Sequence, residues 1–244
     1  MSKLPKAPLL EVIYELRWKV TKQSDLAKYQ YLPGDLYALL KDIYPHREPL
    51  VQIEVPIDVL VNTPVHRFRV GHNRYPLFQV GPGILTFNTI DSEYFSEDYY
   101  ERCNGLTKNF FKVYPHGAED RFSPSLIYFD FFNLDLQKDD VINFINNNLN
   151  LTVAQSFYPT IATANNFNFN FTYQTELGTL SVTLSPDVNN LKQETGLLLQ
   201  TQLSGPEHEA DYLQISKWLE QAHDFCGKLF KNIVKPELYE SFKS

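Results

Sequence analysis

The chain has 244 residues, with 22 lysines and arginines against 29 aspartates and glutamates, and its formal net charge is -7. Hydrophobic residues make up 43% and charged residues 21%, as in a globular protein and unlike a disordered one. The acidic balance argues against a protein that binds duplex DNA by neutralising phosphates. No apolar run approaches the roughly 20 residues of a membrane helix, and the N-terminus lacks the apolar stretch of a signal peptide. We therefore expect a soluble cytoplasmic protein without a membrane partner.

The start of the chain predicts a strand followed by a helix. Apolar and charged residues alternate over residues 10–20, which indicates a strand with one buried face and one charged face. Pro33-Gly34-Asp35 then interrupts the pattern, and Asp35 is a candidate N-cap for a helix with leucines at helical spacing. We expect this helix to end before Pro45, because helical geometry is disfavoured for the residue that precedes a proline.

Four short strands and a longer helix complete the predicted first half. The strands are expected at residues 51–55, 66–70, 76–80 and 84–88. Gly81-Pro82-Gly83 lies between the last two strands, and we interpret it as a hairpin turn. It lacks the lysine and the following helix of a phosphate-binding loop. An amphipathic stretch at 92–114 predicts the helix, with Cys103 near its apolar stripe.

The second half repeats this order of elements. An apolar strand at 125–134 precedes a helix that Asp139 or Asp140 caps. Further strands are expected at residues 166–173, 178–184 and 196–203, with a fourth near 157–162. The closing helix at 211–234 has one broad apolar face that must be buried.

Aromatic residues, which make up 14% of the chain, form one conspicuous stripe in the second half. Its members alternate with asparagine and threonine and are Phe167, Phe169, Phe171 and Tyr173. Such a stripe could line a ligand cavity or stack on single-stranded nucleic acid. We favour a place in the core, because strands that face a long helix need bulky side chains.

Both halves thus predict the order strand, helix, antiparallel strands, helix, in an α+β fold with internal duplication. We expect halves at residues 1–120 and 121–244 that form one continuous structural unit. A curved antiparallel sheet packed on a long helix, used twice, resembles the helix-grip fold of TATA-box-binding-protein-like domains. That resemblance is topological and implies no function by itself. The predicted outward positions are too mixed in charge for a DNA saddle, and they are Glu15, Arg17, Gln52, Glu54, Gln79, Asn168, Asn170, Gln200 and Gln202.

Several motifs resemble a sporadically distributed bacterial protein family without an established activity. They are Glu15-Leu16-Arg17-Trp18, His66-Arg67-Phe68-Arg69-Val70-Gly71, the run Gln-Val-Gly-Pro-Gly-Ile-Leu-Thr-Phe-Asn at 79–88, and Trp218-Leu219-Glu220-Gln221-Ala222-His223. The resemblance spans nearly the whole chain and implies no catalytic residue. The patchy distribution of that family implies horizontal transfer, and hence a link with phage-defence, mobile-element or toxin–antitoxin systems.

The most basic neighbourhood of the sequence is the candidate binding site. Arg67 and Arg69 share one face of a predicted strand, and arginine side chains bind carboxylates or phosphates in a fork geometry. The plainer interpretation is a salt-bridged sheet face, with Glu11, Glu15 and Glu54 as available partners. The candidate binding residues are Arg17, Arg67, Arg69, Gln79, Gly81, Gly83 and Asn88.

No catalytic or metal-binding constellation stands out, and we expect no cofactor. The six histidines lack metal-ligand spacing, and the pair His223 and Cys226 lacks a third orienting group. The leading hypothesis is a non-enzymatic protein-binding or regulatory protein with a protein partner, for which an operon-encoded protein is the first candidate. The alternative is a small-molecule or nucleotide binder, hydrolytic or not, that uses the basic strand face of the first half. Duplex DNA is not an expected partner, and homo-oligomerisation is left open.

Overall fold

A large antiparallel sheet runs through both predicted halves of the chain. The computed structural model describes residues 4–52, 54–94, 96–154, 156, 166–189 and 192–243. The strands in this part of the chain are β1 (Leu9–Trp18), β2 (His46–Pro49), β3 (His66–Arg69), β4 (Leu77–Gly81), β5 (Ile84–Ile90), β6 (Phe122–Asn133), β7 (Phe169–Thr175), β8 (Gly178–Asn189) and β9 (Glu194–Ser204). They form one 9-stranded sheet in the order β2-β3-β4-β5-β1-β6-β9-β8-β7. The central pair, β1 and β6, joins the strands that open the two predicted halves.

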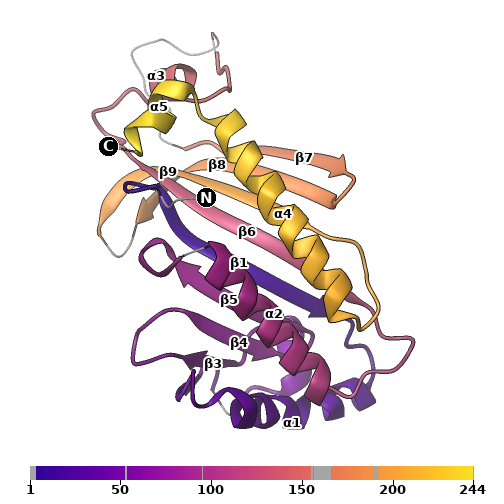
Figure 1. Cartoon of the computed structure of the whole chain (residues 1–244). Helices are drawn as coiled ribbons and strands as arrows, with labels where there is room; N and C mark the ends of the chain where they lie inside the picture. The colour runs from indigo at the N-terminus through magenta and orange to yellow at the C-terminus, as the bar shows by residue number, and fades with distance from the viewer. Residues whose placement is uncertain are drawn as a thin grey trace.

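Helices cover one face of this sheet (Figure 1). In the described residues they are α1 (Gln23–Leu40), α2 (Ser96–Val113), α3 (Val141–Asn148), α4 (Tyr212–Ile233) and α5 (Pro236–Ser241). The order of elements is strand, helix, four strands, helix, and then strand, helix, three strands, helix, with α5 at the end. The chain is therefore a mixed α+β protein, as the periodicity of the sequence predicts, and the strands of both predicted halves join in one antiparallel sheet.

The core lies between the sheet and the helices in two apolar clusters. The larger one packs α1, α2 and α4 against the centre and first half of the sheet, and the smaller one lies under α3 and α5. Aromatic rings fill much of the larger cluster: Trp18 lies with its ring centroid 4.8 Å from that of Phe110, and Phe110 stacks on Tyr114 at 5.0 Å. Much of the aromatic surplus of the sequence is thus core, where large rings contribute the most buried area.

The predicted start of the first helix was wrong. α1 begins at Gln23, twelve positions before Asp35, and Pro33 lies inside it. The Asp25 carboxylate accepts hydrogen bonds from the backbone of the two residues before the helix, which satisfies amides that a helix start leaves unpaired. An interior proline costs roughly 3 kcal/mol. Burial of Leu32 and Leu36 on the helix stripe offsets that cost, because each contributes roughly 1.5–3 kcal/mol.

The predicted strand at 51–55 was also wrong. The strand beside β3 is β2, whose residues pair in register from His46 with Arg69 to Pro49 with His66. Residue 53 lies outside the described residues, and Gln52 and Glu54 belong to no strand. The strand expected near 157–162 lies outside the described residues. The division at residue 120 stays a prediction.

The aromatic stripe of the second half is only partly core. Phe169, Phe171 and Tyr173 lie on the helix-facing side of β7, opposite Leu184, Val182 and Leu180 of β8, and β7 is the last strand of the sheet. As a result Phe171 is 37% exposed and Tyr173 52% exposed. The alternation along the strand predicted the face correctly, but not that the strand would lie at an edge.

Candidate functional site

The sheet face opposite the helices is the first candidate surface, and we call it the open face. Among the described residues no helix packs on it. Residues directly opposite each other on paired strands point to the same face. One row of such partners crosses all the strands, every member is polar, and it consists of Glu48, Arg67, Gln79, Thr86, Glu15, Ser125, Ser204, Thr179 and Gln174.

The two ends of the open face differ in charge and exposure. Charged side chains lie on β1 to β3, and the middle of the row is nearly buried by neighbouring side chains, with Thr86 only 4% exposed. On β7 and on the parts of β8 and β9 nearest to it, residues 179–185 and 198–204, the open-face side chains are uncharged hydroxyls and amides apart from Leu198, and they are half-buried or exposed. The polar members are Asn170, Thr172, Gln174, Thr179, Ser181, Thr183, Ser185, Gln200, Gln202 and Ser204. Farther along the same face, Asp187 of β8 and Glu194 of β9 carry negative charge.

The arginines of the open face are paired with carboxylates. Glu48 Oε1 accepts from Arg69 Nε at 2.8 Å and from Arg67 Nη1 at 3.3 Å. The Arg17 guanidinium donates to both carboxylate oxygens of Glu15, at 3.1 Å in the longer bond. Hydrogen bonds from Arg69 hold the pKa of Glu48 below its usual value. The sequence named Glu15 as an available partner, but it missed Glu48, which only the pairing of β2 with β3 brings to this place.

A second polar chain runs beneath these pairs. Thr86 Oγ1 donates to Asn88 Oδ1 at 2.8 Å, and Asn88 Nδ2 donates to Glu11 Oε1 at 2.9 Å. Burial raises the pKa of Glu11, and the bond from Asn88 opposes that shift. Arg69 Nη1 also donates to the backbone carbonyl of Arg74 at 3.2 Å, so the loop after β3 closes over this end of the network.

The structure brings only some of the candidate residues together. Arg67, Gln79 and Thr86 are successive partners on β3, β4 and β5, and Arg69 and Asn88 lie in the next row. Arg17 lies on β1, three strands from β3, which is roughly 14 Å at the usual strand spacing. It therefore cannot share a small ligand with the other two arginines.

Gly81 and Gly83 are required by the backbone conformation and not by a ligand. A Cβ on Gly81 would lie 1.8 Å from the carbonyl oxygen of Thr63, so the loop before β3 approaches too closely for any side chain. Gly83 has φ +86, which L side chains rarely adopt, and the Pro82-Gly83 turn closes the β4–β5 hairpin. The hairpin interpretation of this motif is confirmed.

One donor in the basic neighbourhood has no partner. Arg67 Nε is buried and makes no hydrogen bond among the described residues, although Nη1 of the same side chain binds Glu48. A buried unsatisfied donor costs about 1–3 kcal/mol. It is the one feature of this neighbourhood that favours an additional acceptor.

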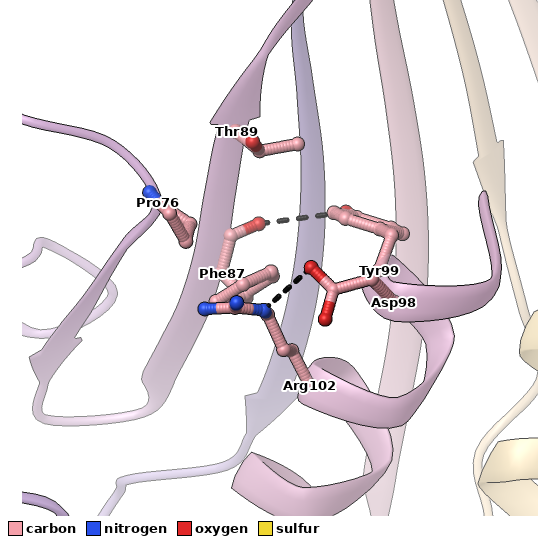
Figure 2. A pocket seen from close by; sticks show the side chains of 6 residues that line it. All are labelled: Pro76, Phe87, Thr89, Asp98, Tyr99 and Arg102. Carbon is pink, nitrogen blue, oxygen red and sulfur yellow. Dashed lines mark hydrogen bonds and ion pairs between the residues drawn. The ribbon is translucent and has the colours of Figure 1, made fainter. Parts of the chain in front are cut away.

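A shallow crevice lies on the helix side, between α2 and β5 (Figure 2). On its α2 side, Arg102 Nε donates to Asp98 Oδ2 of the same helix at 2.7 Å, and on its β5 side Thr89 Oγ1 is buried without a partner in the described residues. The crevice is too shallow to enclose a ligand. The hydrogen bond that joins α2 to β5 here runs from Tyr99 Oη to the backbone carbonyl of Phe87, at 3.5 Å.

A buried tyrosine–histidine cluster, missed in the sequence, joins α4 to β6 and to the start of α2. His223 Nδ1 lies 2.7 Å from Tyr128 Oη and 3.1 Å from Tyr94 Oη. Burial lowers the pKa of His223 and raises the pKa of both tyrosines, so all three are neutral at physiological pH. Burial also raises the pKa of Cys226 to about 12, which makes its thiol a poor nucleophile. The cluster therefore fixes α4 in place, and it contains no activated cysteine–histidine pair.

The structure offers little for metals or membranes within the described ranges. No group of three or more histidines, cysteines, aspartates or glutamates is placed to hold a metal ion there. No helix in the same residues is long and apolar enough to cross a membrane.

Comparison with other proteins does not identify a relative: no family model, no curated protein and no solved structure matches the chain. The resemblance to the sporadically distributed bacterial family thus rests on the sequence motifs alone.

Proposed function

We propose that this chain is a non-enzymatic protein-binding or regulatory protein, and that the β7–β9 part of its open face is the contact surface. The observation that carries the proposal is the combination of accessibility and neutrality there. Uncharged hydroxyl and amide side chains gather over three strands, and no helix of the described residues covers them. Hydroxyls and amides can form many hydrogen bonds with a protein, and over residues 170–174, 179–185 and 198–204 this face carries no charge whose desolvation must be offset; Asp187 and Glu194 lie at its far end.

The same surface suits nucleic acid poorly. Binding to phosphates depends on lysine and arginine, and the arginines of the open face lie on β3 and on the central strand β1, already paired with glutamates. The repeated order of elements on either side of the β1–β6 pair supports the finer fold proposal, a duplicated helix-grip arrangement like that of TATA-box-binding-protein-like domains. The resemblance in sequence supports a partner encoded nearby, in a phage-defence, mobile-element or toxin–antitoxin system.

Matched glutamine substitutions test the contact surface. Gln200→Arg with Gln202→Arg adds two charges to β9 on the open face, whereas Gln214→Arg with Gln221→Arg adds them to exposed positions of α4. Each form is co-expressed with the products of neighbouring genes and captured. We expect the β9 variant to lose the partner by about tenfold or more in affinity and the α4 variant to retain it. Equal retention or equal loss by the two variants contradicts the proposal.

The second candidate function is binding of an anionic small molecule or nucleotide. The observation that favours it is the unpartnered Nε of Arg67 beside Arg69. Thermal unfolding in the presence of inorganic phosphate and a panel of nucleotides tests it. A ligand at 100 times its Kd adds roughly 2.7 kcal/mol of stability, and the gain should disappear in Arg67→Gln. A panel without any shift removes this candidate.

A further inference from the structure

The sheet ends in two edge strands that differ in how well they are protected. β2 at one edge is four residues long, His-Arg-Glu-Pro, so it is short, charged and closed by a proline. Those are the devices that keep an edge from pairing with another chain. β7 at the other edge is seven residues long, Phe-Asn-Phe-Thr-Tyr-Gln-Thr, with no charge, proline or glycine. This edge carries none of the protective devices.

The turn that follows β7 determines which backbone groups point outward. Thr175 pairs with Gly178 across a two-residue loop, and such a flanking pair is hydrogen-bonded in a hairpin. Hydrogen-bonded pairs then alternate along the ladder, so the odd-numbered residues of β7 bond to β8. The N–H and C=O groups of Asn170, Thr172 and Gln174 consequently point away from the sheet. In the described part of the chain no strand pairs with them.

The side chains of β7 also leave apolar area beside this edge. Phe171 and Tyr173 face the helix side, and they are 37% and 52% exposed because α4 packs over β6 and β9. Large aromatic rings on an uncovered edge are the groups most enriched at protein interfaces. A strand added beside β7 would cover both rings.

We propose that β7 pairs in antiparallel fashion with β7 of a second copy of this chain, about a two-fold axis at Thr172. In this register Thr172 lies opposite Thr172 of the second copy, and Asn170 lies opposite Gln174 of the second copy. Every outward N–H and C=O of the three even-numbered residues then finds a partner. The hairpin excludes a shift by one residue, which would place inward-bonded groups at the new interface, and of the registers that remain the axis at Thr172 is the one that pairs all three even-numbered residues of β7 with one another.

The side chains fit the same axis. Phe171 lies opposite Tyr173 of the second copy on the helix side, and aromatic pairs across strands contribute roughly 0.2–1 kcal/mol each. Hydroxyls and amides meet on the open face, and no like charges are opposed, because the strand carries none. The sheet of the described residues has a single unprotected edge, so a two-fold contact closes as a dimer and does not propagate into a fibre. The open faces of the two copies then form one continuous surface, and this pairing holds whether or not that surface binds a partner.

The solution mass tests the dimer. Sedimentation or light scattering of the full chain should give about twice its 28.4 kDa. Thr172→Lys opposes two like charges at the axis and should weaken the dimer by about tenfold or more. Thr183→Lys is the matched control, since it adds the same charge to the same face one strand inward and should leave the mass unchanged. A wild-type chain that stays monomeric over the whole concentration range overturns the proposal, as does a Thr172→Lys variant that stays as dimeric as its control.

Disulfide trapping tests the register. Hydrogen-bonded partners in an antiparallel pair have Cα atoms about 5.5 Å apart, which a disulfide can span. Thr172→Cys should therefore form a cross-linked dimer under mild oxidation, and Thr183→Cys should not. The two native cysteines, Cys103 and Cys226, are buried and do not compete. A dimeric protein in which neither or both engineered thiols cross-link contradicts an axis at Thr172.

Discussion

The buried carboxyl of Asp130 makes stability depend on pH in an unusual direction. Asp130 lies on the helix-facing side of β6 and is 7% exposed. Burial raises its pKa from the usual value near 3.8 to about 7, because the charged form loses its hydration. In the unfolded chain the carboxyl ionises at its ordinary pKa, so over the range between the two values the unfolded state gains stability from ionisation and the folded state does not.

The size of this effect follows from the shift. About 3 pKa units correspond to about 4 kcal/mol, at 1.36 kcal/mol for each unit. Ionisation of Asp130 does not lower the free energy of unfolding below the unfolded-state pKa. The loss grows as the pH rises and reaches its full size above about pH 7. Replacement by asparagine keeps the shape and removes the ionisation. The free energy of unfolding of Asp130→Asn should therefore increase relative to that of the wild type as the pH rises, by about 4 kcal/mol between pH 4 and pH 8.

Urea unfolding of both proteins at a series of pH values measures the difference. Asp42→Asn, the same change at an exposed position after α1, is the matched control. The informative quantity is the change with pH of the difference in unfolding free energy between Asp130→Asn and wild type, because any constant cost of burying the amide cancels in it. A difference that is flat with pH, or that grows toward low pH, refutes the reasoning.

Two further predictions concern glycine and cysteine positions. Gly81→Ala should lower the free energy of unfolding by about 2 kcal/mol or more, because the added Cβ collides with the Thr63 backbone. Gly227→Ala in α4 is the control: its Cβ meets nothing within 4 Å, and the change should raise the free energy of unfolding by about 1 kcal/mol. Denaturant titration measures both variants, and equal effects would contradict the close approach of Thr63 to Gly81. Burial raises the pKa of Cys103 and of Cys226. Neither thiol should therefore react with a disulfide reagent at about pH 8 until urea unfolds the chain. Rapid labelling of the native protein would contradict the burial of these thiols.

Local patterns predicted most of the elements. The 3.6-residue repeat of apolar side chains located α4, and its predicted start, Asp211, is the residue that caps it. The Gly81-Pro82-Gly83 motif located a hairpin, because glycine and proline restrict or permit backbone angles without help from the rest of the fold. Local reasoning failed at Pro33, where long-range burial of the helix stripe outweighs an unfavourable residue.

The candidate site was less predictable than the fold. The sequence placed Arg67 and Arg69 on one face, which follows from strand alternation alone. It could not identify Glu48 as their partner, because that carboxylate comes from a strand that the apolar pattern did not indicate. The sequence likewise did not indicate the partners of His223, because only the packing of α4 on β6 brings it to Tyr128.

Composition and charge by themselves argued for a globular protein ill suited to neutralising phosphates, and periodicity determined which side chains share a face of each strand or helix. Those properties depend on neighbours within a few residues. The tertiary structure decided which strands are central and which are edges, and therefore that Phe171 is exposed while Tyr14 is fully buried. The reason is that strand pairing joins segments far apart in sequence, as in the β1–β6 pair, so the accessibility of a side chain depends on contacts that no local pattern contains.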